Sequence, residues 1–174
     1  GSYATSYIPT YGTSVTRNAD EFSVSNQPEL FGDSEGTLFI DRSALGIYDD
    51  YANISLNSGN FTNSLGIRYN PNGNSMLAQC RVNNANEAFL NHNVTDITDR
   101  IKSAFGYKTN DFAFYVDGSS VGTETSGNTF PDGTLTHMRS ARGDADDFFY
   151  GRIYQILVFK TRLSNEELAA LTTI

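Results

Sequence analysis

Residues 104–122 have the sequence AFGYKTNDFAFYVDGSSVG, which predicts two β-strands and the start of a third. A strand is expected to end at the turn residues Lys108-Thr109-Asn110, and a second strand is expected over 111–116. Asp117-Gly118 is a preferred tight-turn sequence, so the chain should reverse again and begin a return strand near Val121. The stretch therefore predicts antiparallel strands that follow one another in the chain.

The same alternation of apolar and polar residues extends outward from this stretch in both directions. Strands are expected over 36–41, 52–56, 65–69, 76–82, 100–107 and 153–159. Residues 70–74, Asn-Pro-Asn-Gly-Asn, have turn chemistry and predict a hairpin between the third and fourth of these. Residues 153–159 are apolar on both faces except at Gln155, which predicts a position in the centre of a sheet.

One short helix is expected at the end of the chain. Ser164 is a favoured N-cap residue, and Glu167 stands three residues later as its capping-box partner. Leu163 and Leu168 have the spacing of a hydrophobic staple, and Leu168 and Leu171 supply an apolar face. A helix of two or three turns needs a surface to dock on, so it should pack on the sheets.

The composition excludes several classes of partner. The chain carries 12 Lys+Arg against 20 Asp+Glu, a net charge of −8, which has the wrong sign for nucleic-acid binding. No window approaches about 18 consecutive apolar residues, so no membrane insertion is expected. The first twelve residues, GSYATSYIPTYG, lack the basic and apolar regions of a signal peptide. With Cys80 as the single cysteine, an internal disulfide is impossible.

These patterns predict an all-β fold, a two-sheet antiparallel jelly-roll sandwich with one short C-terminal helix. Neither a linker nor an internal repeat divides the chain, so a single domain over 1–174 is expected. Gly1-Ser2 has the form of a remnant of a removed tag, which would make the chain an excised domain.

Three segments carry a resemblance to a known family. Residues 104–122 resemble the strand-turn-strand block of laminin-G-like jelly rolls in the concanavalin A-like lectin/glucanase superfamily. The ending, FYGRI at 149–153 through Phe159 and then RLSNEEL at 162–168, is similar to the closing strand and short helix of that superfamily. The opening, ATSYIPT at 4–10 with VTRNAD at 15–20, is similar to a stretch that precedes such jelly rolls in bacteriophage and prophage tail-fibre and structural proteins.

The resemblance implies the fold but no particular activity, because this fold hosts lectins, lyases, glucanases and adhesion modules. A retaining glucanase needs two carboxylates about 5 Å apart, which the superfamily supplies from a Glu-x-Asp-x-x-Glu strand. Glu29, Asp33 and Glu35 have a different spacing, in a loop-like stretch. His92 and His137 do not lie in lyase-like motifs, and Tyr107-Lys108 is better explained as a strand end and turn.

Other catalytic motifs are also missing from the sequence. The chain has no Gly-x-Ser-x-Gly elbow, P-loop or dinucleotide fingerprint. Cys80 falls on the apolar face of its predicted strand, where a buried, inert thiol is expected. No enzymatic activity is therefore expected.

Acidic residues concentrate in two loops, at Asp49-Asp50 and at Asp144 to Asp147, and the second is a candidate calcium site. Calcium takes six to eight oxygen ligands, and laminin-G-like domains often hold it in their rim loops. Asp144, Asp146 and Asp147 could form part of such a site with loop carbonyls, whereas the alternative is an acidic loop that only solvates the surface.

The same loops are candidate glycan-binding rims, because tyrosines can stack on sugar faces and charged groups can bond to hydroxyls. The predicted ligand-binding residues are Tyr48, Asp49, Asp50, Tyr51, Arg139, Arg142 and Phe148. The alternative is that the aromatic residues among them pack at strand ends. The absence of Trp predicts weak binding at each site, which several copies would strengthen.

Three functions follow in order of preference. The first is a non-catalytic domain of a phage tail appendage or other virion surface protein that binds a bacterial surface polysaccharide or other glycan, with a virion or extracellular location. The second is a structural module that associates with other copies or domains of its parent protein, for example as a trimer. The third, least favoured, is a polysaccharide-degrading enzyme.

Overall fold

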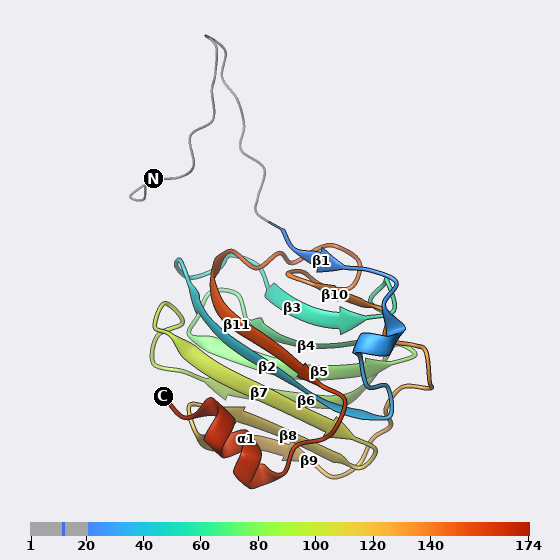
Figure 1. The fold of residues 1–174 in the computed structure, drawn as a ribbon. Coiled ribbons are helices and arrows are strands. Elements are labelled where there is room, and N and C mark those ends of the chain that lie inside the picture. Colours follow the sequence, from blue (N-terminus) through green and yellow to red (C-terminus); the bar gives the residue numbers. More distant parts are fainter. Residues whose placement is uncertain (1–11, 13–20) are drawn as a thin grey trace.

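The computed structural model describes residue 12 and residues 21–174, which fold into two stacked antiparallel sheets and one helix (Figure 1). Within these residues, one sheet has six strands in the spatial order β1 (Ser23–Val24), β10 (His137–Arg139), β3 (Ala52–Asn57), β4 (Ser64–Tyr69), β5 (Ser75–Val82) and β6 (Ala85–Asn93). The other has five, in the order β11 (Gly151–Phe159), β2 (Glu35–Ala44), β7 (Ile101–Lys108), β8 (Asp111–Val116) and β9 (Ser119–Glu124). The predicted all-β jelly-roll sandwich is confirmed.

The β7–β8–β9 meander follows the sequence closely. Ser103 pairs with Val116 and Phe105 with Phe114 across the first hairpin. Asp117 and Gly118 both have positive φ, 46° and 79°, as the predicted tight turn requires. The hairpin between β4 and β5 is confirmed as well, with Tyr69 paired to Met76.

Alternate side chains from both sheets fill the space between them. Core residues include Leu38, Ile40, Ile54, Leu56, Leu65, Ile67, Phe105, Phe112 and Phe114. Cys80 belongs to this core and is fully buried, as its alternation predicts, and burial raises the pKa of its thiol. A short 3-10 turn, Pro28–Leu30, precedes β2.

The expectation that residues 153–159 lie in the centre of a sheet is wrong. Among the described strands, β11 pairs only with β2 and forms the edge of the five-stranded sheet. Its two apolar faces have another cause: Ile156 and Val158 pack into the core, whereas Leu157 packs on the outer side with the helix residue Leu168.

The helix α1 (Asn165–Thr172) has the predicted capping box. The Ser164 side chain accepts from the Glu167 N–H, and the Glu167 carboxylate accepts from the Ser164 N–H. Leu168 is fully buried against the outer face of the five-stranded sheet, with Leu163 packed beside it. The helix therefore covers part of the outer face, over β7 and β8.

In the described part of the chain, no helix has the length and apolarity needed to cross a membrane. The opening residues 4–10 and 15–20, which carry the likeness to phage proteins, and Gly1-Ser2 lie outside the described residues.

Candidate functional site

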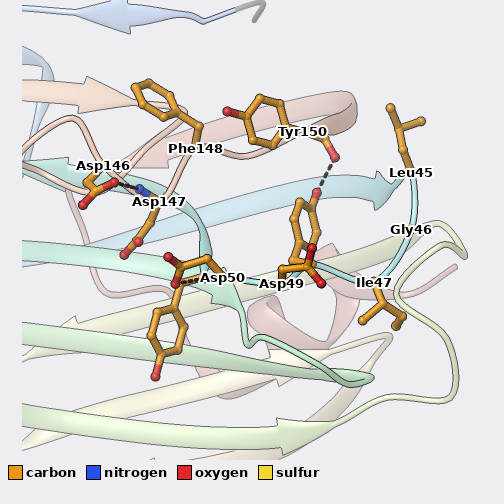
Figure 2. Close-up of a pocket in the computed structure, with 11 residues that line it drawn as sticks. Leu45, Gly46, Ile47, Asp49, Asp50, Asp146, Asp147, Phe148 and Tyr150 are labelled. Carbon is orange, nitrogen blue, oxygen red and sulfur yellow. Dashed lines mark hydrogen bonds between the residues drawn. The ribbon is translucent and has the colours of Figure 1, made fainter. Parts of the chain in front are cut away.

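A pocket of about 480 Å³ lies at one end of the sandwich, between the β2–β3 loop and the residues that lead into β11 (Figure 2). The register Ala44↔Gly151 brings these distant parts of the chain together. Asn53 completes the junction, because its N–H donates to the Asp147 carbonyl over 2.9 Å and it bridges to Phe148. The lining residues are Leu45, Gly46, Ile47, Tyr48, Asp49, Asp50, Tyr51, Asp146, Asp147, Phe148 and Tyr150.

The structure joins two loops that the sequence analysis treated as separate rims. Of the predicted site residues, the pocket lining includes Tyr48, Asp49, Asp50, Tyr51, Asp146, Asp147 and Phe148. Three others, Arg139, Arg142 and Asp144, do not line it. Arg142 nevertheless reaches the lining through its contacts with Asp146 and Asp147.

Tyr48 belongs to the core as much as to the pocket. Its ring stacks on Tyr69, with centroids 6.0 Å apart, and lies 6.4 Å from the ring of Phe149. Its hydroxyl donates to the Tyr150 carbonyl, which ties the two pocket loops together. Burial raises the pKa of this hydroxyl, so it stays protonated and remains a donor.

A buried arginine lies beneath this aromatic group. The Arg42 guanidinium is fully buried, 4.1 Å from the centroid of Tyr69 and 5.3 Å from that of Phe149. It donates to the Ile67 carbonyl over 3.1 Å and forms no ion pair with another described residue. Its burial lowers the pKa of Arg42. Cation–π contacts with the rings of Tyr69 and Phe149 therefore offset part of the cost of removing the guanidinium charge from water.

A second arginine supports the other aromatic residue of the loop. The Arg68 guanidinium lies over the ring of Tyr51, 4.1 Å from its centroid. Arg68 lies on the outward face of β4 and is only 9% exposed. The stack fixes the plane of the Tyr51 ring in the pocket wall.

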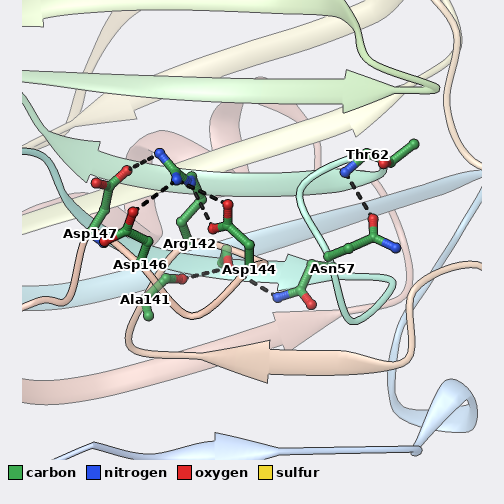
Figure 3. A network of polar contacts seen from close by, with 9 residues as sticks. Asn57, Thr62, Ala141, Arg142, Asp144, Asp146 and Asp147 are labelled. Atoms are coloured by element: carbon green, nitrogen blue, oxygen red, sulfur yellow. Dashed lines mark hydrogen bonds and ion pairs between the residues drawn. The ribbon is translucent and has the colours of Figure 1, made fainter.

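Arg142 organises the second loop of the pocket (Figure 3). Its guanidinium makes two bonds to the Asp144 carboxylate, of 2.7 and 2.9 Å. It also bonds to the carboxylates of Asp147, at 2.8 Å, and Asp146, at 3.2 Å. Ala145 and Asp147 have positive φ, so this cluster holds a sharply bent segment.

The carboxylates of the cluster have different proton affinities. Bonds from Arg142 lower the pKa of Asp144 and raise that of Arg142 itself. The Asp147 side chain is 3% exposed, and burial raises its pKa despite the ion pair. Asp50 and Asp146 raise the pKa of Asp147 further.

The three predicted calcium ligands thus surround a guanidinium. Within the part of the chain that the structure describes, no group of three or more acidic, His or Cys side chains is arranged to hold a metal ion. A calcium ion at Asp144, Asp146 and Asp147 would have to displace Arg142, so this arrangement does not fit the ion. Calcium binding here stays a prediction.

The loop that contains Arg142 also covers polar side chains on the outer face of the six-stranded sheet. Ser55 donates to the Ala141 carbonyl over 2.7 Å, and the Asn57 amide donates to the Ser55 hydroxyl over 3.1 Å. Arg139 lies on β10 beside Ser55, outside the pocket lining. The loop is therefore anchored on the sheet as well as by its own ion pairs.

Sequence reasoning missed the apolar wall of the pocket. Leu45 is 56% exposed, Ile47 is 51% exposed and Tyr150 is 48% exposed. Ile47 directly precedes the predicted rim residue Tyr48, Leu45 lies in the same loop, and Tyr150 lies two residues after Phe148. An apolar residue in a loop close to tyrosines and aspartates was the available signal. Arg68 was also missed, although its place on the polar face of a predicted strand puts it on the outer side of the sheet.

Asp33 and Glu35, two of the three carboxylates compared with the glucanase pattern, contact neighbouring segments of the chain. Asp33 accepts from the N–H groups of Gly133 and Leu135, at 2.8 and 2.7 Å. Glu35 lies 3.4 Å from the Lys108 amine. His92 lies in β6 and His137 in β10, both partly buried.

No protein-family model and no curated protein matches this chain. Solved structures do match its fold. The carbohydrate-binding module CBM40 of the Ruminococcus gnavus IT-sialidase has a TM-score of 0.68 at 15% identity, over 81% of this chain and 84% of that one. A SAP-like pentraxin from Limulus polyphemus has a TM-score of 0.67 at 11% identity, over 90% and 76%. Domain 4 of AbnA, an extracellular arabinanase from Geobacillus stearothermophilus, has a TM-score of 0.67 at 8% identity, over 88% of each chain.

Proposed function

We propose that this domain is a non-catalytic glycan-binding module and that the pocket between residues 45–51 and 146–150 is its binding site. The observation that carries the proposal is the convergence of exposed apolar and aromatic side chains with carboxylates in one pocket. Sugars present an apolar face of C–H groups and a rim of hydroxyls, so they match such a lining.

The structural neighbours support this class of ligand. The R. gnavus module has also been solved bound to α2,3- and α2,6-sialyllactose, and the AbnA domain has been solved in complex with arabinotriose. At 8–16% identity these likenesses concern the fold, so the ligand of this chain has to be argued from its own residues.

We further propose that the parent protein is a phage tail appendage or another virion surface protein and that the ligand is a bacterial surface polysaccharide. The support is the likeness of residues 4–10 and 15–20 to segments of phage structural proteins. A repeated display of the domain would compensate for weak binding at each pocket.

The experiment is a glycan array and a bacterial-cell binding assay on the isolated domain, with and without calcium. We expect binding that Tyr150→Ser reduces at least about fivefold, because the ring forms the exposed wall. Phe89→Ser is the matched control, since Phe89 is an aromatic residue of similar exposure, 53%, on β6 and outside the pocket. Absence of binding to every glycan and cell would overturn the proposal, and release of reducing ends or unsaturated uronates would show catalysis instead.

The unpaired edge of β11 favours a second candidate function, the assembly of several copies or domains. The free edge of β11 pairs with no other described strand, and Ile153 and Tyr154 are 37% and 47% exposed on it. Exposed strand edges are surfaces on which chains associate. Light scattering separates the roles: a trimer whose mass does not change with concentration favours assembly, and a monomer favours recognition alone.

A further inference from the structure

The pocket lining is uneven in charge. It holds four carboxylates, those of Asp49, Asp50, Asp146 and Asp147, and no Lys, Arg or His. Figure 2 shows Asp50, Asp146 and Asp147 toward one side of the pocket, Leu45 and Ile47 toward the other, and Asp49 between them. A ligand in the pocket therefore meets negative charge next to apolar surface.

The negative charge is only partly compensated. Asp146 and Asp147 share the Arg142 guanidinium, at 3.2 and 2.8 Å. Asp49 and Asp50 are exposed and form no ion pair with any described residue, although Asp50 accepts the Tyr51 N–H over 2.8 Å. A concave surface lined by one sign of charge concentrates ions of the opposite sign. The side of the pocket at Asp49 and Asp50 should attract a cation.

Arg142 and Arg68, which contact residues of the pocket lining, are not available to an anionic ligand. The Arg142 guanidinium is already bonded to three carboxylates. The Arg68 guanidinium lies behind the Tyr51 ring and is nearly buried. A carboxylate on a ligand would enter this negative pocket without a cationic partner in its lining, which is unfavourable.

The apolar wall adds an independent requirement. Leu45, Ile47 and Tyr150 are each about half exposed, and an apolar surface of this kind is typical of a ligand contact. A simple metal cation or a small amine offers nothing to cover it. A sugar ring does, and the two features together describe a saccharide that bears a positive charge.

We propose, on the basis of the glycan-binding function above, that this pocket selects saccharides with a free, protonated amino group. The ring covers the apolar wall, and the ammonium lies at Asp49 and Asp50. N-acetylation removes the charge and weakens binding, and a carboxylate on the sugar weakens it further. The preference of this chain is thus opposite to that expected from the sialyllactose-bound neighbours.

The expected preference follows from the strength of exposed ion pairs. One or two such pairs should make the amino form bind about three- to tenfold more tightly than its N-acetyl form at low salt. Because exposed charges are screened within about 3 Å at 1 M salt, the preference should fall to about twofold or less there.

The test uses matched saccharides and calorimetry or NMR titration at about pH 6, where an amine is protonated. Glucosamine tetramer is compared with N-acetylglucosamine tetramer, and sialyllactose with lactose. We expect glucosamine tetramer to bind more tightly than its acetylated form, and lactose more tightly than sialyllactose. Equal affinities within both pairs, or tighter binding of sialyllactose than of lactose, overturn the inference.

Charge variants locate the effect. In Asp49→Asn with Asp50→Asn, the ratio of the two tetramer affinities should fall to about one. The control, Asp132→Asn with Glu166→Gln, removes the same charge from exposed residues elsewhere and should keep the wild-type ratio. A ratio that persists in the first variant also overturns the inference.

Failure of this inference is distinguishable from failure of the proposed function. If saccharides bind in a way that Tyr150→Ser abolishes but show no amine preference, the glycan function stands and the selectivity is wrong. If no saccharide or cell binds under any condition, the proposed function fails, and the selectivity fails with it.

Discussion

The Arg142 guanidinium donates to the Asp147 carboxylate over 2.8 Å, and this contact joins the sharply bent loop to the wall of the pocket. Asp147 is the buried member of the pair, with its side chain 3% exposed against 23% for Arg142. The arginine is thus the partner that allows a carboxylate to be buried beside β3. Removing Arg142 and removing the Asp147 carboxylate should therefore change the free energy of unfolding by different amounts.

Arg142→Met should destabilise the domain by about 2–3 kcal/mol at neutral pH, because it leaves the Asp147 charge buried without its partner. Urea unfolding followed by tyrosine fluorescence measures the change. Asp144→Asn is the matched control, since it removes a more exposed carboxylate and should cost less than about 1 kcal/mol.

The Arg142→Met defect should also depend on pH. Burial raises the pKa of Asp147, so its protonated form is favoured in the folded state as pH falls. Protonation removes the unpaired charge, and the destabilisation should shrink between neutral pH and pH about 4. Asp144 has the opposite sign: its lowered pKa gives stability above its unfolded pKa that is lost at more acidic pH. A defect that grows on acidification would contradict this assignment.

Arg42 should respond differently to the same kind of substitution. It is buried with no ion pair among the described residues, so Arg42→Met removes a desolvated charge and keeps most of the volume. The free energy of unfolding should change by less than about 1 kcal/mol or increase. Arg42→Ala is the comparison, since it leaves a cavity under Tyr69 and should cost about 2 kcal/mol or more. A large loss in the methionine variant would mean that the charge itself stabilises the aromatic group.

Gly143 lies where the pocket loop packs closely against the loop between β3 and β4. A Cβ at this position would lie 2.1 Å from the Asn60 carbonyl oxygen, a backbone atom that has little room to move. Gly143→Ala should therefore displace the loop and cost about 1–3 kcal/mol, with weaker glycan binding. Gly73→Ala is the matched control, because a Cβ there meets nothing within 4 Å. Equal stabilities of the two variants would show that the loop shifts without strain.

The calcium site that the sequence predicts at Asp144, Asp146 and Asp147 can be tested by substituting Arg142. An ion held by Asp144, Asp146 and Asp147 competes with the guanidinium, so Arg142→Gln should bind calcium at least about tenfold more tightly than the wild type. Calorimetry with calcium alone measures the affinities, and Asp144→Asn with Asp146→Asn should abolish the binding. If neither protein binds calcium, the acidic loop is not a calcium site.

The capping box should contribute measurably although the helix is short. Ser164→Ala removes the acceptor for the Glu167 N–H and should cost about 1 kcal/mol. In a domain of this size the melting temperature should then fall by about 2–4 °C. Ser119→Ala, at an exposed strand position, is the control and should change it little.

The strands that sequence predicts well are those with clean alternation. Residues 76–82 place Cys80 in the core exactly where a period of two puts it, and the capping residues around Ser164 define the helix start. Strand β6 (Ala85–Asn93) escaped prediction because polar residues outnumber the buried ones in it. Residues 153–159 have the apolar pattern of a central strand because a helix that covers one face of an edge strand produces the same pattern.

The sequence predicts most of the residues that line the pocket, but it does not predict how they are arranged in space. The chemistry of Tyr48, Asp50 and Phe148 predicts a binding role for each residue. Local sequence does not show that their loops meet, because that depends on the register between β2 and β11. Local sequence also could not show that Arg142 faces three carboxylates. Sequence spacing shows only that Arg142 and the aspartates are close in the chain. The bent backbone of the loop, with positive φ at Ala145 and Asp147, determines that their side chains face one another.

The pairing of β2 with β11 sets the order in which this pocket can form. Ala44 pairs with Gly151, so more than a hundred residues must be synthesised between the two halves of the wall. Contacts of such long sequence separation form late and slowly. During synthesis, β2 can pair with β7 first, whereas its edge toward β11 and the apolar loop that follows it stay uncovered until β11 emerges. Binding competence therefore arises only after β11 has emerged and paired with β2, and a chain truncated before β11 would lack one wall of the pocket.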